Sequence, residues 1–507
     1  MTRSAHDSRR ATRSVWLAVA SGALLTLSYA PFDWPLVAWV AWTPLLVALD
    51  GAPLRRAVAL GWLSGTIGGL GITGYWIDRA AADYFGLSAL GAALFTFGVV
   101  QVFVAPFYGL FAALANGLGA SRVRLLLIPA ALVLCEAARS QLTGNAWALL
   151  GHAVGPLPIV QIVDVTGVAG LSFLLALSAA IAADLCRDLL GRVGWRTVLL
   201  RRAGELLFGT AVVGAVVAYG DWRLDHLPPA SATLRVLLVQ GAIDNAARSA
   251  ANAAEAIRRY VGLTEAAPPA PLVVWPENAI AVFPEQNDAL LTPVHVLVAE
   301  RGTTLLAGAP RAGDRAGRAA LFNSLYAFNA AGSWPVYDKR RLLPFVERFP
   351  LRSQDGPYVP GEAPVPFVLG AAHAGLLICY EVIDAGLARA AVADGANLLV
   401  NASNDSWFAA GAGPEQHFAI ARFRAIENRV ALLRATDSGI SGAFDPSGDE
   451  LARLPADTPT AQIVDVPLVN GGSFYTRHGD WLVLVCAVTV GLGAIAQLAR
   501  QLSRRRR

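Results

Sequence analysis

Apolar and polar positions follow two different patterns along the chain, and the pattern changes near residue 220. Before that point, long apolar runs alternate with short polar segments. Most of the apolar runs are long enough to cross a bilayer as a helix, which takes about 17 to 25 residues. The run at 86–116 is longer and contains Pro106, so we expect it to be tilted or broken there. The pattern predicts about eight transmembrane helices, at 13–31, 35–50, 55–77, 86–116, 122–139, 159–185, 203–220 and 480–499.

Between about residues 230 and 470 the apolar runs become short and rich in β-branched residues, as in "LRVLLVQ", "PLVVWPE", "AGLLICYE" and "NLLVNASN". A helical stretch, "PEQHFAIARFRAIENRV", separates "NLLVNASN" from a further run, "VALLRATD", and "FNAAGSWPVYDK" has the pattern of a β-hairpin. Alternating strands and helices indicate a layered α/β domain. We therefore expect a transmembrane domain of about seven helices at 1–220, a catalytic domain at 221–475, and a last helix with a basic tail at 476–507.

The arginines predict how the helices are oriented. The loops at 31–35, 77–86 and 140–158 contain almost no arginine, whereas the intervening segments and both termini are basic. Because positive residues stay on the cytoplasmic side, both termini are expected in the cytoplasm and 221–479 outside it. The arginines on the predicted inner side are Arg3, Arg9, Arg10, Arg13, Arg55, Arg56, Arg122, Arg124, Arg187, Arg192, Arg196, Arg201, Arg202 and Arg504 to Arg507.

Composition agrees with a membrane protein and excludes some partners. Of 507 residues, 55% are hydrophobic and 15% are charged, which is too apolar for an ordinary soluble enzyme. The net charge is +4, and the arginines lie at the ends of apolar runs and form no basic stripe, so we expect no nucleic-acid partner.

One cation and one thiol are exceptional. Lys339 is the only lysine beside 40 arginines, so it is either a chance survivor or a site where a guanidinium does not serve. Cys379 is the only cysteine of the predicted outer block, where it has no disulfide partner, so it is either a buried inert thiol or a reactive one. The other three cysteines, in or beside predicted spans, read as small buried hydrophobic residues.

Cys379 ends one strand-like run and is followed by Tyr380 and Glu381. Glu277 follows another such run, and "YDKRRLLPFVE" supplies Lys339 and Glu347. A thiol becomes a nucleophile when a base takes its proton, and an ammonium can stabilise the oxyanion that forms when a carbonyl is attacked. A carboxylate, an ammonium and a thiol therefore make a complete acyl-transfer site.

These segments resemble a known family. Glu277 after "WP", Lys339 in "Y-x-K-x-x-L-x-P-F-x-E" and Cys379 in "CYE" resemble the nitrilase superfamily of carbon–nitrogen hydrolases. With "SYAPFDWPLVAWVAWTPLL", "LTGNAWALLGH", "LVNASNDSWF" and "FYTRHGDW", nearly the whole chain resembles the apolipoprotein N-acyltransferases, its membrane-anchored members. The resemblance implies an α-β-β-α sandwich, with Glu277 as general base, Lys339 as oxyanion stabiliser and Cys379 as nucleophile.

Further expectations come from the resemblance. Glu347, Tyr380 and Glu381 match supporting positions of the family, and Trp407 matches a tryptophan near the mouth of the site. The resemblance implies a bacterial inner-membrane enzyme with its catalytic domain on the periplasmic side. The donor is then a phospholipid, by resemblance the sn-1 chain of phosphatidylethanolamine, and the acceptor is a diacylglyceryl apolipoprotein. We expect a monomer that needs no metal or other cofactor.

The sequence also departs from the family pattern. The segment at 239–250 lacks an Asn and a Lys-Trp pair, Val346 replaces a Gly, and Asp437 with Ser438 replaces a pair of Asn. None of these positions belongs to the triad, but they bear on the loops over the pocket.

Two other functions fit parts of the sequence. A membrane-tethered amidase would use the same triad with water as acceptor, although a small soluble substrate needs no multi-span platform. A transport or binding protein with an inactive nitrilase-like domain would use the acidic residues in predicted spans, Glu136, Asp164 and Asp184. Trp147, in an outer loop, is either an interfacial aromatic residue or part of a lipid entrance.

Overall fold

The computed structural model describes residues 2–191, 193–243, 250–315, 317–344, 346–347, 358–364, 366–408 and 411–505. The chain forms two compact units. The helical unit comprises residues 1–82, 87–225 and 480–507, and the sheet unit comprises 83–86 and 226–479. The main part of the sheet unit is therefore inserted in the sequence between the last two long helices of the helical unit.

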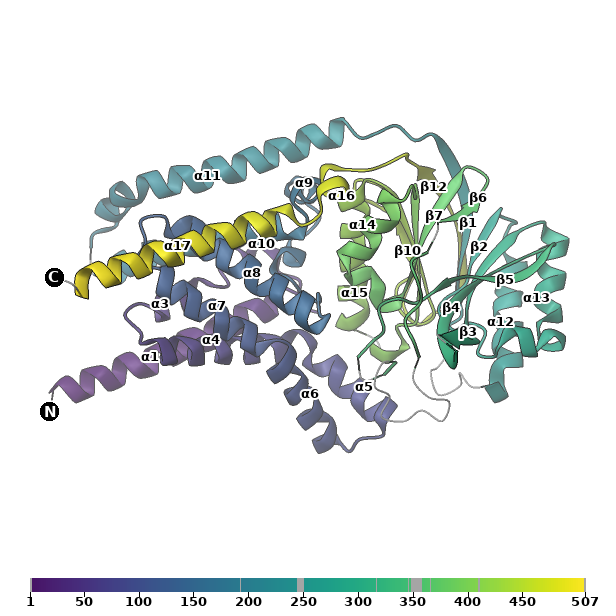
Figure 1. Cartoon of the computed structure of the whole chain (residues 1–507), viewed down its shortest axis with the longest axis horizontal. Helices are drawn as coiled ribbons and strands as arrows, with labels where there is room; N and C mark the ends of the chain where they lie inside the picture. The colour runs from purple at the N-terminus through teal and green to yellow at the C-terminus, as the bar shows by residue number, and fades with distance from the viewer. Residues whose placement is uncertain are drawn as a thin grey trace. The chain divides into compact units, whose positions relative to one another are not determined.

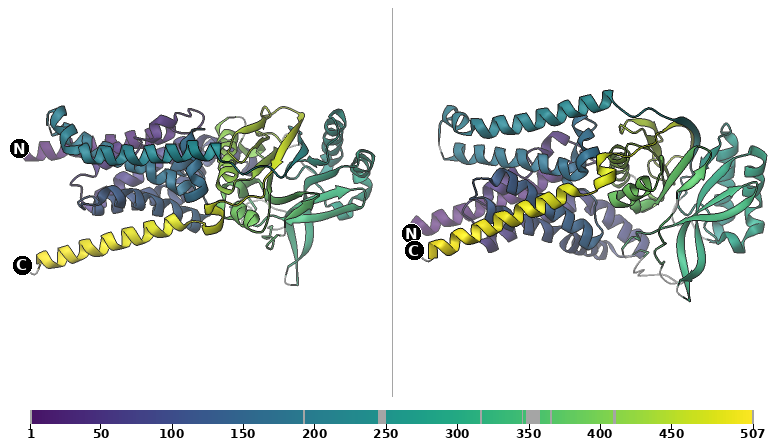
Figure 2. Two further views of the ribbon diagram at one scale, coloured as in Figure 1. Left: turned by 90° about the horizontal axis from the view of Figure 1, so that it is seen from above. Right: turned by 45° about the horizontal axis from the view of Figure 1, so that its top comes forward.

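The helical unit is a bundle in which most of the long helices run in broadly the same direction (Figure 2). Gly61 lets two of them approach closely, because a Cβ there would overlap the Cβ of Ala112. The α-helices of this unit are α1 (Thr2–Leu27), α2 (Pro35–Ala38), α3 (Thr43–Ala48), α4 (Leu54–Gly69), α5 (Tyr75–Phe85), α6 (Ala89–Phe103), α7 (Ala105–Leu118), α8 (Arg124–Thr143), α9 (Val163–Thr166), α10 (Val168–Leu190), α11 (Trp195–Asp225) and α17 (Trp481–Arg505). The last residues of α5, from residue 83 on, belong to the sheet unit.

Six helical segments of the described chain are long and apolar enough to cross a membrane, so the expected count of eight is approximate. The predicted span at 35–50 is two short helices, α2 and α3, because Pro44 in the first turn of α3 starts a new helix. The predicted span at 13–31 lies mostly in α1, whose apolar part is shortened by Arg10 and Arg13. The break expected near Pro106 is confirmed, since α6 ends at Phe103 and α7 begins at Ala105. The six spans are Leu54–Phe85, Ala89–Leu118, Arg124–Thr143, Val168–Leu190, Trp195–Asp225 and Trp481–Ser503.

The sheet unit contains two six-stranded sheets. The first has the strand order β12-β1-β2-β3-β4-β5 and the second has the order β11-β10-β9-β8-β7-β6. The strands are β1 (Ala232–Gln240), β2 (Leu272–Val274), β3 (Thr304–Arg315), β4 (Arg318–Asn329), β5 (Gly332–Asp338), β6 (Phe367–Leu369), β7 (Ala372–Ile378), β8 (Leu398–Ser403), β9 (Ala431–Thr436), β10 (Gly442–Phe444), β11 (Glu450–Arg453) and β12 (Thr460–Leu468).

Helices cover the outer faces of both sheets (Figure 1). On the first sheet lie α12 (Ala253–Ala266) and α13 (Asp288–Arg301), with Tyr260 and Trp275 in a shared apolar cluster. The second sheet is covered by α14 (Ala385–Ala393) and α15 (Ala412–Asn428), and α16 (Phe474–His478) follows β12. The predicted α-β-β-α sandwich is confirmed.

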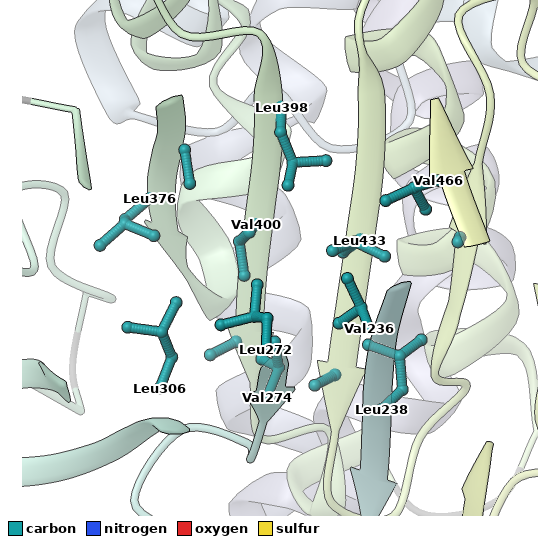
Figure 3. Packing of buried hydrophobic residues seen from close by; sticks show 14 of the residues in the cluster. Val236, Leu238, Leu272, Val274, Leu306, Leu376, Leu398, Val400, Leu433 and Val466 are labelled. Carbon is teal, nitrogen blue, oxygen red and sulfur yellow. The ribbon is translucent and has the colours of Figure 1, made fainter. Parts of the chain in front are cut away.

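The inner faces of the two sheets share one apolar core (Figure 3). Val236 and Val274 from the first sheet meet Val400 and Leu433 from the second. Each strand presents these residues at alternate positions, as expected for a sheet with one face on the core. The core holds the carboxyl ends of β2 and β7 rigidly, and the polar residues of interest follow those ends.

The predicted hairpin is confirmed, since β4 and β5 pair antiparallel with Asn329 opposite Gly332. Residues 244–249 of the unusual segment at 239–250 lie outside the described residues. Asp437, another departure, is fully buried; it accepts hydrogen bonds from the hydroxyl of Tyr260 and, at 2.8 Å, from the backbone N–H of Ile243. It thus ties the end of β9 to α12.

Candidate active site

Glu277 follows β2, in a turn that packs directly on β3. Gly308 of β3 permits this contact, because a Cβ there would lie 2.6 Å from the Cα of Glu277. The Glu277 side chain is 8% exposed. Its Oε1 accepts hydrogen bonds from Asn323 Nδ2 at 2.7 Å and Lys339 Nζ at 3.1 Å, and its Oε2 accepts one from the Asn404 backbone N–H at 3.0 Å. The carboxylate is held on both oxygens and has one fixed orientation.

Lys339 follows β5 and is 2% exposed. Its Nζ lies 3.1 Å from Glu277 Oε1 and 3.0 Å from Glu347 Oε1. Burial lowers the pKa of Lys339, but the carboxylates of Glu277 and Glu347 outweigh it and hold the pKa well above 10.5. The side chain is therefore an ammonium at any physiological pH.

Asn323, in the middle of β4, is a site residue that the sequence analysis missed. Its Nδ2 donates to Glu277 Oε1 and to Glu347 Oε1, both at 2.7 Å, so it bridges the two carboxylates. Its backbone carbonyl accepts a 2.8 Å hydrogen bond from the backbone N–H of Lys339. The signal available was the polar pair Asn323 and Ser324 in the otherwise apolar strand "LFNSLYAF".

Cys379 comes directly after β7, with a backbone φ of +50°. The left-handed conformation is unusual for a residue with a Cβ and turns the chain sharply out of the strand. Burial, followed by the carboxylate of Glu277, raises the pKa of the Cys379 thiol to about 12, and Lys339 opposes this shift. The resting thiol is therefore protonated at neutral pH, and its attack on a carbonyl requires a base that takes the proton.

Glu381 is fully buried and links the Cys379 segment to the Lys339 segment. Its Oε1 accepts hydrogen bonds from the backbone N–H groups of Arg340 at 2.7 Å and Arg341 at 2.9 Å. Its Oε2 accepts one from the backbone N–H of Ile378 at 2.7 Å and one from the Tyr337 hydroxyl at 2.8 Å. The predicted supporting residue thus fixes the distance between two strand ends.

Replacing Glu381 with glutamine should loosen that link. One carboxylate oxygen would become an amide nitrogen, which cannot accept the two hydrogen bonds that this oxygen receives. Two buried donors would then be left unpaired. We expect the thermal unfolding midpoint in detergent to fall by about 5–10 °C. The exposed Glu450→Gln is the matched control and should leave the midpoint unchanged; an equal midpoint for both variants would contradict the linking role.

Glu277, Lys339 and Cys379 line one pocket with a cavity volume of about 220 Å³. Glu347 and Trp407, two other predicted site residues, also line it. Tyr84, which sequence analysis missed, contributes a ring whose centroid lies 3.7 Å from that of Trp407. The remaining lining residues are Asn278, Pro310, Asn323, Leu343, Val346, Tyr358 and Asn404.

Two predicted site residues have other surroundings. Tyr380 is partly buried and packs against the core between the sheets. Trp147 belongs to the helical unit and is 4% exposed, with its ring centroid 5.1 Å from that of Trp76. Its role at a lipid entrance stays a prediction.

The pocket has the parts for acyl transfer through a cysteine. It contains a protonated thiol, a carboxylate with a fixed orientation and a permanent ammonium. Among the residues that the structure describes, no group of three or more His, Cys, Asp or Glu could hold a metal ion.

Comparison with known proteins places both parts of the chain. Residues 21–181 match the family described as "Apolipoprotein N-acyltransferase N-terminal domain", and residues 235–475 match "Carbon-nitrogen hydrolase". Among solved structures, an amidase from Nesterenkonia sp. is 22% identical, over 47% of this chain and 91% of that one, with a TM-score of 0.36.

Similar proteins extend over nearly the full length. A protein of Geobacter metallireducens named apolipoprotein N-acyltransferase is 33% identical, over 96% of this chain and 95% of its own. One of the same name from Methylococcus capsulatus is 32% identical, over 95% of each chain. The chain belongs to the apolipoprotein N-acyltransferase family.

Proposed function

We propose that this protein transfers an acyl chain from a phospholipid, through a thioester on Cys379, to the α-amino group of the S-diacylglyceryl cysteine of an apolipoprotein. The donor proposed is the sn-1 chain of phosphatidylethanolamine. The observation that carries the proposal is that Glu277, Lys339 and Cys379 line the same pocket. It occurs in a chain whose full-length relatives are named apolipoprotein N-acyltransferase.

In the first half-reaction, Glu277 takes the proton of the Cys379 thiol and the thiolate attacks the ester carbonyl of the phospholipid. The negative charge that develops on the carbonyl oxygen is stabilised by the ammonium of Lys339 and by the backbone N–H of Tyr380. The tetrahedral intermediate collapses, and the leaving alkoxide takes the proton from Glu277. A lysophospholipid departs and an acyl thioester remains on Cys379.

In the second half-reaction, the α-amino group of the lipoprotein attacks the thioester carbonyl, and Glu277 accepts the proton that this nitrogen loses. The amide forms, the thiolate of Cys379 leaves, and the proton returns to it from Glu277. Because the two substrates use the same sulfur in turn, the kinetics are ping-pong.

The helical unit has a place in this proposal, since both substrates are lipids that stay in a bilayer. The arginine distribution supports both termini in the cytoplasm and the sheet unit on the periplasmic side of the bacterial inner membrane. We propose that the protein acts as a monomer.

The transport alternative finds less support, because the buried acids of the helical unit have structural partners. Asp184 pairs with Arg124 at 2.6 Å and Arg187 at 2.5 Å, and Asp164 pairs with Arg223 at 2.8 Å. Glu136, the third, accepts a 2.6 Å hydrogen bond from the backbone N–H of Leu150. These contacts join helices and loops of one bundle.

The test is the mass of the intact protein after incubation in detergent with phosphatidylethanolamine alone. We expect a gain of one acyl chain that neutral hydroxylamine removes, because thioesters are cleaved under conditions that leave amides intact. Phosphatidylethanolamine with different sn-1 and sn-2 chains identifies the chain that is transferred. A folded protein that gains no mass would contradict the phospholipid half-reaction and favour the amidase, which amide substrates would then test.

A further inference from the structure

Behind Cys379 lies a buried polar cluster that the mechanism above does not use. We define it as Asn401 and Ser403 on β8, Asp405 just after β8, and Arg434 on β9. All four residues are at most 1% exposed. Arg434 lies directly across from Asn401 in the parallel pairing of β8 with β9. Buried polar groups in such number are retained where they fix a geometry.

Asn401 connects the cluster to the backbone of the nucleophile. Its Nδ2 donates to the carbonyl of Cys379 at 3.3 Å and to that of Leu377 at 3.4 Å. Its Oδ1 accepts a hydrogen bond from Arg434 Nη1, which sets the orientation of the amide. The cluster therefore holds the carbonyl of a residue whose backbone is in the strained left-handed conformation.

Ser403 connects the cluster to the side chain of the nucleophile. Ile378 pairs with Ala402 in the register of β7 and β8, so the next positions along the two strands place Ser403 beside Cys379. In agreement with this proximity, the Ser403 hydroxyl is among the groups that lower the pKa of the Cys379 thiol. The Ser403 hydroxyl, however, donates to Asp405 Oδ1 at 2.8 Å, and a hydroxyl has one proton to donate.

Asp405 can lose the hydrogen bond from Ser403, because other groups also donate to its carboxylate. Arg434 Nη2 donates to its Oδ1 at 2.8 Å and to its Oδ2 at 2.6 Å. The Nδ1 of His417 lies 3.1 Å from Asp405 Oδ1 and 2.8 Å from Arg434 Nη2. Turning the Ser403 hydroxyl away thus leaves the Asp405 carboxylate paired with a guanidinium.

We propose that this cluster positions Cys379, and that the Ser403 hydroxyl turns from Asp405 to the sulfur when Cys379 gives its proton to Glu277. Asn401 holds the backbone of the nucleophile, and Ser403 supplies a donor only when the sulfur is negative. No covalent bond of the cluster changes: the proton of the thiol goes to Glu277, and Ser403 keeps its own. Ser403 is a positioning residue, and its role rests on the proposed function of Cys379 as nucleophile.

Three charged groups act on the pKa of the Cys379 thiol. The carboxylates of Glu277 and Asp405 raise the pKa of Cys379 and the ammonium of Lys339 lowers it, while a hydrogen bond from Ser403 to the thiolate lowers it too. Asp405 itself is paired with Arg434, with His417 beside it. Removing the serine hydroxyl should therefore raise the thiol pKa and reduce the thiolate present at a given pH.

The test measures the alkylation of Cys379 by iodoacetamide between pH 7 and pH 10, followed on its peptide by mass spectrometry. In Ser403→Ala, about ten-fold less thiolate is expected at each pH below the thiol pKa. The remaining thiolate is more nucleophilic, which offsets part of this loss. Alkylation should therefore be only about three-fold slower across the range. Ser403→Thr keeps the hydroxyl and should restore the rate.

Ser441→Ala is the matched control, because Ser441 is equally buried and its hydroxyl bonds Gln240, outside the cluster. Wild-type alkylation in Ser403→Ala, or equal slowing in Ser441→Ala, would overturn the proposal. If Ser403→Ala does not fold, Ser403→Gly carries the same expectations. Alkylation needs no lipid, so the two failures can be told apart: a wild-type protein that forms no acyl adduct would refute the proposed function, whereas unchanged alkylation in Ser403→Ala would refute the hydrogen bond from Ser403 to the thiolate.

Discussion

Exchanging Cys379 for serine should lower N-acylation of a diacylglyceryl lipopeptide by at least about four orders of magnitude. The exchange replaces the sulfur by an oxygen and leaves its buried surroundings in place. A hydroxyl is a far weaker acid than a thiol, so Glu277 cannot generate the nucleophile, and an ester on serine would be a poorer acyl donor to an amine than a thioester. The thermal unfolding midpoint should stay near that of the wild-type protein.

The measurement is the rate of appearance of the triacylated peptide, with the adduct on the intact protein as a second readout. Cys186→Ser is the control, because Cys186 lies in α10 of the helical unit and has no part in the mechanism. It should acylate at the wild-type rate. Appreciable turnover in the Cys379 variant, with normal folding, would show that another group carries the acyl chain.

Replacing Lys339 with arginine should reduce acyl transfer by about 100-fold, and replacing it with methionine by about 100- to 1000-fold. The Lys339 side chain is 1% exposed and its nitrogen sits between two carboxylates, 3.1 Å and 3.0 Å away. A planar guanidinium is too large for that position and cannot present one charge to both carboxylates and an oxyanion. Methionine would leave Glu277 and Glu347 buried without a cation and should destabilise the fold by about 3–5 kcal/mol.

Arg340→Lys is the control for this pair of variants. It exchanges the same two side chains one position along the chain, where the contact with Glu381 is made by the backbone N–H. Acylation rates and thermal unfolding midpoints of all three variants should be measured together. Lys339→Arg with wild-type activity would show that the lone lysine is an accident of composition.

The sequence alone indicated where the site would form, but only at the ends of strands. The strand pattern identified Glu277 and Cys379 as residues that follow buried strands, although β2 and β7 belong to different sheets, whose face-to-face packing brings the two residues to one pocket. The pattern was not enough for Asn323, which lies in mid-strand, where a polar residue is indistinguishable from the solvent-facing positions of an alternating pattern. Tyr84 could not be placed either, since it lies in the predicted outer loop at 77–86, far along the chain from the strands that supply the other site residues.

The helices show a similar division. Long apolar runs indicated their approximate number, whereas the run at 35–50 looked like one span and is two short helices. Hydropathy is averaged over a window of residues. A proline within that window can divide one expected helix into two while the average hydropathy stays the same. The buried cluster around Asp405 was also beyond sequence reasoning, because the partner of each residue depends on the register between β8 and β9.

The order of strands in the first sheet has a consequence for synthesis. β1, the first strand made, pairs along its whole length with β12, the last, with Ala232 opposite Leu468 and Gln240 opposite Thr460. Until the ribosome has passed residue 468, one edge of β1 exposes a row of unpaired N–H and C=O groups that can recruit other strands. A nascent chain stalled before β12 therefore keeps β1 as an unpaired edge strand. The pairing of β12 with β1 late in synthesis is an aggregation-sensitive step.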